Sequence, residues 1–305
     1  MKAGTNLEKI LESGMFAVTA EAGPPKGTST TVIERKGELL RRHCDAINIT
    51  DNQTAIVRMS SLAGCILLKQ QGVDPVMQIV VRDRNRVAIQ SDVLGAVALG
   101  IGNILCLSGD HQQFGNHPAT RGVFDIDSIQ LIQTLKQMRD ERKFLSGDDI
   151  SGDVPLFIGA AANPYADPFE FRVARLAKKV KAGADFIQTQ AVYNVAKFIE
   201  WMETVREQRL DKQVHILAGV IPIKSTGMAR YMRDYVSGIS VPDEIVTRME
   251  EAKDTKHEGL KIALEVIEQL KEIAGVHGIH VMAVGWEDIV PEIVEKAGLL
   301  PRPVL

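Results

Sequence analysis

The segment Leu105-Cys-Leu-Ser-Gly-Asp110 puts a carboxylate on a turn directly after an apolar run of the kind that forms a buried strand. Three other short segments end in the same way: Glu21 follows Phe16–Ala20, Asp51 follows Ala46–Thr50, and Gln190 follows Asp185–Thr189. Polar side chains at the same end of many strands are typical of a barrel whose active site lies on one rim. The segment therefore predicts a rim site that contains Asp110.

The alternation of short β-branched runs with longer helical patterns continues along the whole chain. We predict strands over 16–20, 46–50, 76–81, 104–107, 156–160, 186–189, 214–220 and 280–284. Helical patterns lie between them over 31–43, 56–71, 87–99, 126–142, 168–182, 195–207, 228–236, 242–251 and 256–274, with a last one over 291–297. Eight strand–helix units predict a (β/α)8 TIM barrel, an α/β fold, forming one domain over residues 1–305. A doubly wound open sheet is the alternative, but no G-x-G-x-x-G follows the first strand.

Composition limits the classes of partner. The net charge of -3 gives no electrostatic reason to expect nucleic acid or an anionic membrane surface. Three cysteines without a C-x-x-C pair, and seven histidines without metal-ligand spacing, predict neither a disulfide framework nor a metal site. The first ten residues carry charges where a signal peptide needs an apolar core, and no apolar run approaches the roughly 20 residues that span a bilayer. We expect a cytoplasmic protein.

Glu21 is the first candidate for chemistry. It ends a predicted strand and precedes Gly23-Pro-Pro25, a stretch whose backbone has few accessible conformations. Partial burial would raise the pKa of its carboxyl group and suit it to general-acid catalysis. The alternative is an interior ion pair with a lysine or arginine.

Asp110 and Gln190 are the second and third candidates. Asp110 follows Gly109, which permits a ligand to approach the backbone closely, although a turn or helix-cap aspartate has the same pattern. Gln190 offers a donor and an acceptor to the edge of a heterocycle, or it caps a turn. Four basic residues before Gly183 form either a solvated helix face or, for one or two of them, a phosphate site: Arg175, Lys178, Lys179 and Lys181.

Taken together, these motifs resemble the methylenetetrahydrofolate reductase family over nearly the whole chain. The landmarks are Ala20-Glu-Ala-Gly-Pro-Pro25, Asn48-Ile-Thr-Asp51, Leu107-Ser-Gly-Asp110, Lys178-Lys-Val-Lys-Ala-Gly-Ala184, Thr189-Gln190 and Gly219-Val-Ile-Pro222. Six such motifs in the right order at strand ends are specific together, although each is weak alone. Members of the family are flavoproteins on a (β/α)8 barrel that reduce 5,10-methylenetetrahydrofolate to 5-methyltetrahydrofolate.

The resemblance implies a role for each candidate. Glu21 matches the general acid that assists opening of the methylene bridge. Asp110 matches the carboxylate beside the flavin that contacts the pterin and tunes the flavin potential, and Gln190 matches the amide that binds the pterin. The positions that match the family's flavin-binding residues are Thr50, Asp51, Gln78, Ser108, Gly109, Asp110, Ala162, Lys178 and Lys179.

The chain also departs from the family pattern. It has Ala20-Glu-Ala-Gly-Pro-Pro25 in place of Phe-Glu-Phe-Phe-Pro-Pro, Ala162-Asn-Pro164 without the usual aromatic and histidine, methionines at 228 and 232, and Trp286 in place of an arginine. These changes affect the dinucleotide half of the flavin and the pocket shared by nicotinamide and folate. The resemblance implies FAD, and these departures leave FMN as an alternative. NADH, NADPH, ferredoxin and a partner subunit all remain open as electron donors.

Variants of this kind resemble those of acetogenic and other anaerobic bacteria, in which a companion subunit delivers electrons. We expect tetrahydrofolate as the substrate class and a homo- or hetero-oligomer. Two other functions stay open at this point. One is a flavin-free, folate-binding barrel that passes a methyl group to a corrinoid protein. The other is a catalytically silent scaffold, against which the retained Glu21, Asp110 and Gln190 argue.

Overall fold

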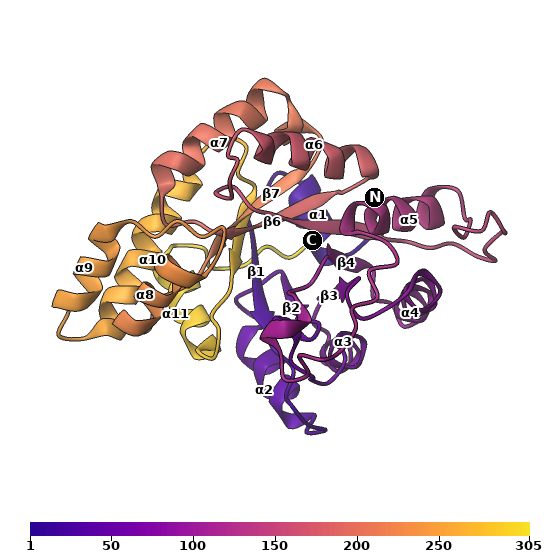
Figure 1. Cartoon of the computed structure of the whole chain (residues 1–305), viewed down its shortest axis with the longest axis horizontal. Helices are drawn as coiled ribbons and strands as arrows, with labels where there is room; N and C mark the ends of the chain where they lie inside the picture. The colour runs from indigo at the N-terminus through magenta and orange to yellow at the C-terminus, as the bar shows by residue number, and fades with distance from the viewer.

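The computed structural model describes residues 1–305 and confirms the barrel. Eight parallel strands pair in chain order, and the last strand closes the barrel against the first. They are β1 (Ala17–Ala22), β2 (Ala46–Ile49), β3 (Pro75–Val80), β4 (Asn103–Leu107), β5 (Phe157–Ala162), β6 (Phe186–Ala191), β7 (His215–Val220) and β8 (Gly278–Val281). Figure 1 shows the strands at the centre of the molecule with the helices around them.

The connecting segments are mostly helical, as predicted. The helices are α1 (Asn6–Glu12), α2 (Thr31–Leu40), α3 (Ser61–Gln70), α4 (Arg86–Ala98), α5 (Ser128–Asp140), α6 (Phe171–Ala182), α7 (Val195–Glu207), α8 (Thr226–Tyr235), α9 (Asp243–Glu251), α10 (Thr255–Lys271) and α11 (Val290–Lys296). Short 3-10 turns are η1 (Gln53–Ala55), η2 (Gln112–Phe114), η3 (Leu210–Lys212) and η4 (Glu287–Ile289). None of the helices is both long enough and apolar enough to cross a membrane.

Several predicted boundaries differ from the structure by two residues or more, and for two of them the physical reason is clear. The helix predicted from residue 56 begins at Ser61, because the Ser60 side chain caps it by accepting the backbone N–H of Ala63 at 3.3 Å. The last strand begins at Gly278, two residues earlier than predicted. A Cβ at Gly278 would lie 2.3 Å from the carbonyl oxygen of Ala17, so only glycine allows β8 to approach β1 this closely.

Helix α1, which we did not predict, closes the N-terminal end of the barrel. It buries Leu7, Ile10 and Leu11 against the barrel interior. The interior residues that it meets are Ala17, Ala46, Val76, Leu105, Phe157, Phe186 and Leu217, one from each of the first seven strands. With this end filled by apolar side chains, the C-terminal rim is left for a ligand.

The layer above this apolar floor is polar. Side chains on a strand alternate between its two faces, so two residues beyond Ala17 comes Thr19, and two beyond that comes Glu21 at the rim. On four other strands, the interior position level with Thr19 is also polar: it is Asn48, Gln78, Gln188 or His280. All five side chains are at most 5% exposed. Branched apolar residues usually fill this position in a (β/α)8 barrel, so the polar layer needs an explanation of its own.

Candidate active site

The C-terminal rim contains a cavity of about 380 Å³, called here the rim cavity. It brings together the three candidates for chemistry: Glu21 from the end of β1, Asp110 from the loop after β4, and Gln190 from β6. Other predicted site residues that line it are Asp51, Gln78, Ser108 and Gly109. The structure thus places these strand-end side chains around one cavity at the rim.

Glu21 is held by two partners. The amide Nε2 of Gln78 donates to its Oε1 at 2.9 Å, and Nε2 of His280 lies 3.6 Å from the same oxygen. Burial raises the pKa of the Glu21 carboxyl, but the hydrogen-bond and charge contributions of His280 and the amide of Gln78 outweigh it, so the pKa lies below its usual value. The expectation of a raised pKa was wrong, because it counted burial without these donors.

Asp110 is exposed and is held through both its side chain and its backbone. Its Oδ2 accepts the backbone N–H of Thr54 at 2.9 Å, and its carbonyl oxygen accepts Nη1 of Arg82 at 2.9 Å. Arg82 is buried and also donates to Asp83 and to the carbonyl of Asn52, so it joins the loops after β2, β3 and β4. Asp110 caps no helix, since His111 is the N-cap residue of η2.

Gln190 owes its position to a bulge in β6. The register between β6 and β7 shifts between Gln188 and Ala191. There the Thr189 hydroxyl donates to the carbonyl of Gln190 at 2.8 Å and accepts the backbone N–H of Gly219 at 2.9 Å. A Cβ at Gly219 would lie 2.3 Å from the carbonyl oxygen of Thr189, so the bulge requires glycine on the neighbouring strand. Bulges of this kind redirect a side chain at barrel rims, here toward the cavity.

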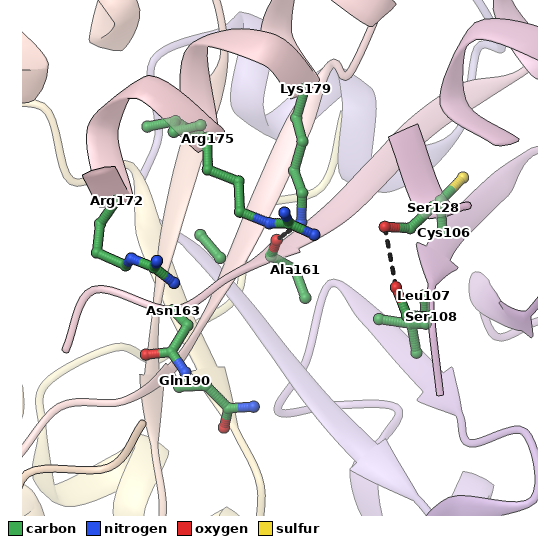
Figure 2. A pocket seen from close by; sticks show the side chains of 12 residues that line it. Cys106, Leu107, Ser108, Ser128, Ala161, Asn163, Arg172, Arg175, Lys179 and Gln190 are labelled. Carbon is green, nitrogen blue, oxygen red and sulfur yellow. Dashed lines mark hydrogen bonds between the residues drawn. The ribbon is translucent and has the colours of Figure 1, made fainter. Parts of the chain in front are cut away.

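A second cavity of about 330 Å³ adjoins the first and is called here the basic cavity. Arg172, Arg175 and Lys179 of α6 line it, and Figure 2 shows all three side chains directed toward β5. Lys179 is 8% exposed and donates to the carbonyl of Ala161; burial and the neighbouring Arg175 lower its pKa to about 8. The two cavities share Leu107, Ser108, Ala161 and Gln190.

Three of the predicted flavin-binding residues either lie outside both cavities or are already paired with other residues. Lys178 is exposed and lines a groove between α5 and α6, because adjacent helical residues point about 100° apart. Asp51 lines the rim cavity, but its carboxylate accepts Arg84 at 2.6 Å and the backbone N–H of Val80 at 2.9 Å. Thr50 lines neither cavity; it is buried, and its hydroxyl has no hydrogen-bond partner. Ala162 lines the basic cavity.

Sequence reasoning missed His280, Arg82 and Arg172. His280 is the one polar side chain in the apolar run from Ile279 to Ala283, and that isolation was the available signal. Arg82 follows β3 as Asp110 follows β4, so the same strand-end rule could have selected it. Arg172 lies one turn before Arg175 on α6, and only the fold tells which side of that helix faces the rim.

Comparison with known proteins decides the family. A sequence model described as methylenetetrahydrofolate reductase matches residues 6–298. The chain belongs to this family. Among curated methylenetetrahydrofolate reductases, it is 29% identical over 214 residues to methylenetetrahydrofolate reductase 2 of Saccharomyces cerevisiae, covering 66% of this chain and 33% of the relative. It is 28% identical over 218 residues to methylenetetrahydrofolate reductase 2 of Schizosaccharomyces pombe, covering 67% of this chain and 32% of the relative.

The chain therefore spans about a third of the length of the curated methylenetetrahydrofolate reductases that it matches. Among solved structures, it resembles an uncharacterized protein from Clostridium thermocellum that binds two copies of 5-methyl-5,6,7,8-tetrahydrofolic acid. The TM-score is 0.65 at 16% identity, over 96% of this chain and 97% of the other. At that identity the likeness concerns the fold.

Proposed function

We propose that the chain is a flavin-dependent methylenetetrahydrofolate reductase, which converts 5,10-methylenetetrahydrofolate to 5-methyltetrahydrofolate. The observation that carries the proposal is the convergence of Glu21, Asp110 and Gln190 on one cavity in a member of this family. The folate bound by the structural relative from Clostridium thermocellum has the chemistry of the proposed product.

The residues at the rim fit a flavin. Two adjoining cavities offer an elongated space, with cations at one end for a phosphate or pyrophosphate and Asp110 at the other. Gly109 lines the rim cavity and has no side chain, so a ligand can approach its backbone closely. Ser108, Gly109, Ala162, Lys179, Arg172 and Arg175 are the residues that would hold it. A bound flavin, once reduced, supplies the hydride.

The chain's own residues supply the acid and the orientation. Glu21 gives a proton to the substrate nitrogen that leaves the methylene carbon as the bridge opens. Gln190 offers its amide to the pterin edge, and Asp110 accepts from the pterin N–H groups. The charge of Asp110 would disfavour negative charge on the ring of a bound flavin and so lower the reduction potential of that flavin.

Replacing Glu21 with glutamine tests the proposal. Glu21→Gln keeps the shape and removes the transferable proton, so we expect folate turnover to fall by about 10²–10⁴, the range for loss of a general acid. Flavin binding and reduction should persist. Glu12→Gln, at the end of the N-terminal helix α1 and 55% exposed, is the matched control and should leave turnover unchanged.

Isolation of the protein tests the cofactor. We expect a yellow protein, and extraction with mass measurement of the flavin will distinguish FAD from FMN. Near-wild-type folate turnover in Glu21→Gln would contradict the assignment of the acid. A colourless protein that still binds folate and methylates a corrinoid would instead support methyl transfer.

A further inference from the structure

A hydrogen-bonded chain runs through the polar layer of the barrel to His280, whose Nε2 lies 3.6 Å from Oε1 of Glu21. Asn48 and Gln188 pair through both amides, with Nδ2 of Asn48 donating at 2.7 Å and Nε2 of Gln188 donating back at 3.1 Å. Nε2 of Gln188 also donates to Oγ1 of Thr19 at 3.1 Å, and that oxygen lies 2.9 Å from Nδ1 of His280. The members come from β2, β6, β1 and β8.

The lengths of these contacts favour one position for the imidazole hydrogen of His280. The Thr19 oxygen already receives a hydrogen from Gln188, so its own hydrogen is free to be donated. Nδ1 of His280, at 2.9 Å, is a closer acceptor than the carbonyl of Ile279 at 3.4 Å. We assign Nδ1 as the acceptor on this ground, which puts the ring hydrogen on Nε2, 3.6 Å from Oε1 of Glu21. That distance exceeds a hydrogen bond, and such contacts often tighten only when substrate binds.

We propose that His280 is a positioning residue that sets the acidity of Glu21, and that the buried Thr19–Gln188–Asn48 chain holds its Nε2–H toward that carboxylate. This inference rests on the proposed role of Glu21 as the acid. When Glu21 has given its proton to the substrate nitrogen, it becomes a carboxylate, and the N–H groups of His280 and Gln78 face it. Donors that stabilise the ion formed in the step make the acid stronger. Hydrogen bonds from His280 and Gln78 each act to lower the pKa of Glu21, the direction that this arrangement requires.

Other charged groups near Glu21 are mostly paired among themselves. In the rim cavity, Asp51 pairs with Arg84, and Arg82 pairs with Asp83, while Asp110 accepts from Thr54. A smaller cavity on the other side of Glu21 is lined by three charged residues: Lys36, Arg58 and Glu287. Lys36 and Glu287 pair at 2.6 Å, and Arg58 donates to the carbonyl of Pro24. His280 is the one titratable side chain recorded in contact with the Glu21 carboxylate.

Two substitutions of His280 separate its two contacts. An asparagine amide reaches the position of Nδ1 and keeps the Thr19 bond, whereas a glutamine amide reaches the position of Nε2 and keeps a donor toward Glu21. The measurement is kcat/KM for methylenetetrahydrofolate between pH 3 and 8.5, a range that includes the lowered pKa of Glu21, with the flavin reduced beforehand by dithionite. For the wild type, the value should fall as the pH rises above the pKa of Glu21, because the acid form is lost. In His280→Asn this fall should begin about one pH unit higher, and in His280→Gln it should stay close to the wild type.

Substitutions of Thr19 test the same positioning role, at the residue that contacts Nδ1 of His280. Thr19→Val keeps the shape but removes the hydroxyl that donates to Nδ1, so the profile should shift in the same direction as in His280→Asn. Thr19→Ser keeps the hydroxyl and should restore the wild-type profile. If wild type reduces folate and both His280→Asn and Thr19→Val leave the pH profile in place, the positioning role is wrong. If the wild-type protein reduces no folate, or Glu21→Gln removes no activity, the proposed function or its acid fails instead.

Discussion

The carboxylate of Asp110 accepts the backbone N–H of Thr54 at 2.9 Å, although the two residues lie on loops after different strands. Thr54 has φ 58° and ψ 28°, a left-handed conformation that β-branched residues rarely adopt. Its neighbours Asn52 and Ala55 also have positive φ. A residue proposed to bind the pterin thus also holds a strained turn at the edge of the rim cavity.

Relief of this strain should stabilise the protein. Thr54→Asn keeps the N–H that binds Asp110 and places there a residue that tolerates the left-handed region. We expect the free energy of unfolding to rise by about 1 kcal/mol, measured by urea denaturation. Thr30→Asn is the control, because Thr30 has φ -67° and no strain to relieve. An equal rise in both variants would show that the backbone of Thr54 is not the cause.

Removal of the charge at Asp110 should change both the reduction potential of the flavin and the affinity for folate. Asp110→Asn keeps an oxygen that accepts the N–H of Thr54, so the loop should stay in place. The flavin potential should rise by roughly 30 mV, which corresponds to about 1.4 kcal/mol for two electrons, and folate should bind more weakly. Potentiometric titration and folate binding measure the two effects. Unchanged values of both would remove Asp110 from the site.

Lys179 should make flavin affinity depend on pH. The pKa of this buried lysine is about 8 because of burial and the neighbouring Arg175, so its positive charge is present below pH 8 and lost above it. Affinity for a phosphate-bearing flavin should therefore fall as the pH rises from 7 to 9.5, as measured by fluorescence quenching. Lys179→Arg, which stays charged, should flatten this dependence. Lys178→Arg is the matched control on the outer face and should leave the dependence as in wild type.

His277 should make the fold sensitive to acid. Its Nδ1 accepts the backbone N–H of Ile216 at 3.1 Å, and its ring lies 5.2 Å from that of His215. Burial and His215 lower the pKa of His277 from 6.5 to about 4, so the unfolded chain binds more protons between these values. Stability is then lost as the pH falls from about 6.5 through 4. Since the side chain is partly exposed, we expect a loss of about 1–2 kcal/mol.

Urea denaturation between pH 4 and 7 measures this loss. His277→Asn keeps an oxygen that accepts from Ile216 and removes the titrating ring, so the slope of stability against pH should decrease. His257→Asn, on the exposed face of α10, is the control. A slope that is the same in all three proteins would place the acid sensitivity elsewhere.

Local sequence patterns were sufficient to predict the barrel and to predict which side chains lie at its rim. The carboxyl ends of parallel strands meet at one edge, so Glu21, Asp110 and Gln190 could be assigned to one site from their places after apolar runs. Helix α1 escaped this reasoning because its seven residues carry only three buried apolar side chains, too few for a periodic signal. The placement of Lys179 at the basic cavity and of Lys178 outside it could not be predicted, because helical period separates the two faces without saying which one meets the barrel.

The sequence by itself determined that this chain forms a (β/α)8 barrel and which end carries polar groups, because alternation and strand-end chemistry are properties of neighbouring residues. Only the tertiary structure decided the partners of those groups. Closure of the barrel brings His280 beside Thr19, 261 residues away, and so places a donor against Glu21. The pKa of Glu21 is lowered and not raised for that reason, since a carboxyl group responds to the atoms within a few ångströms and not to its place along the chain.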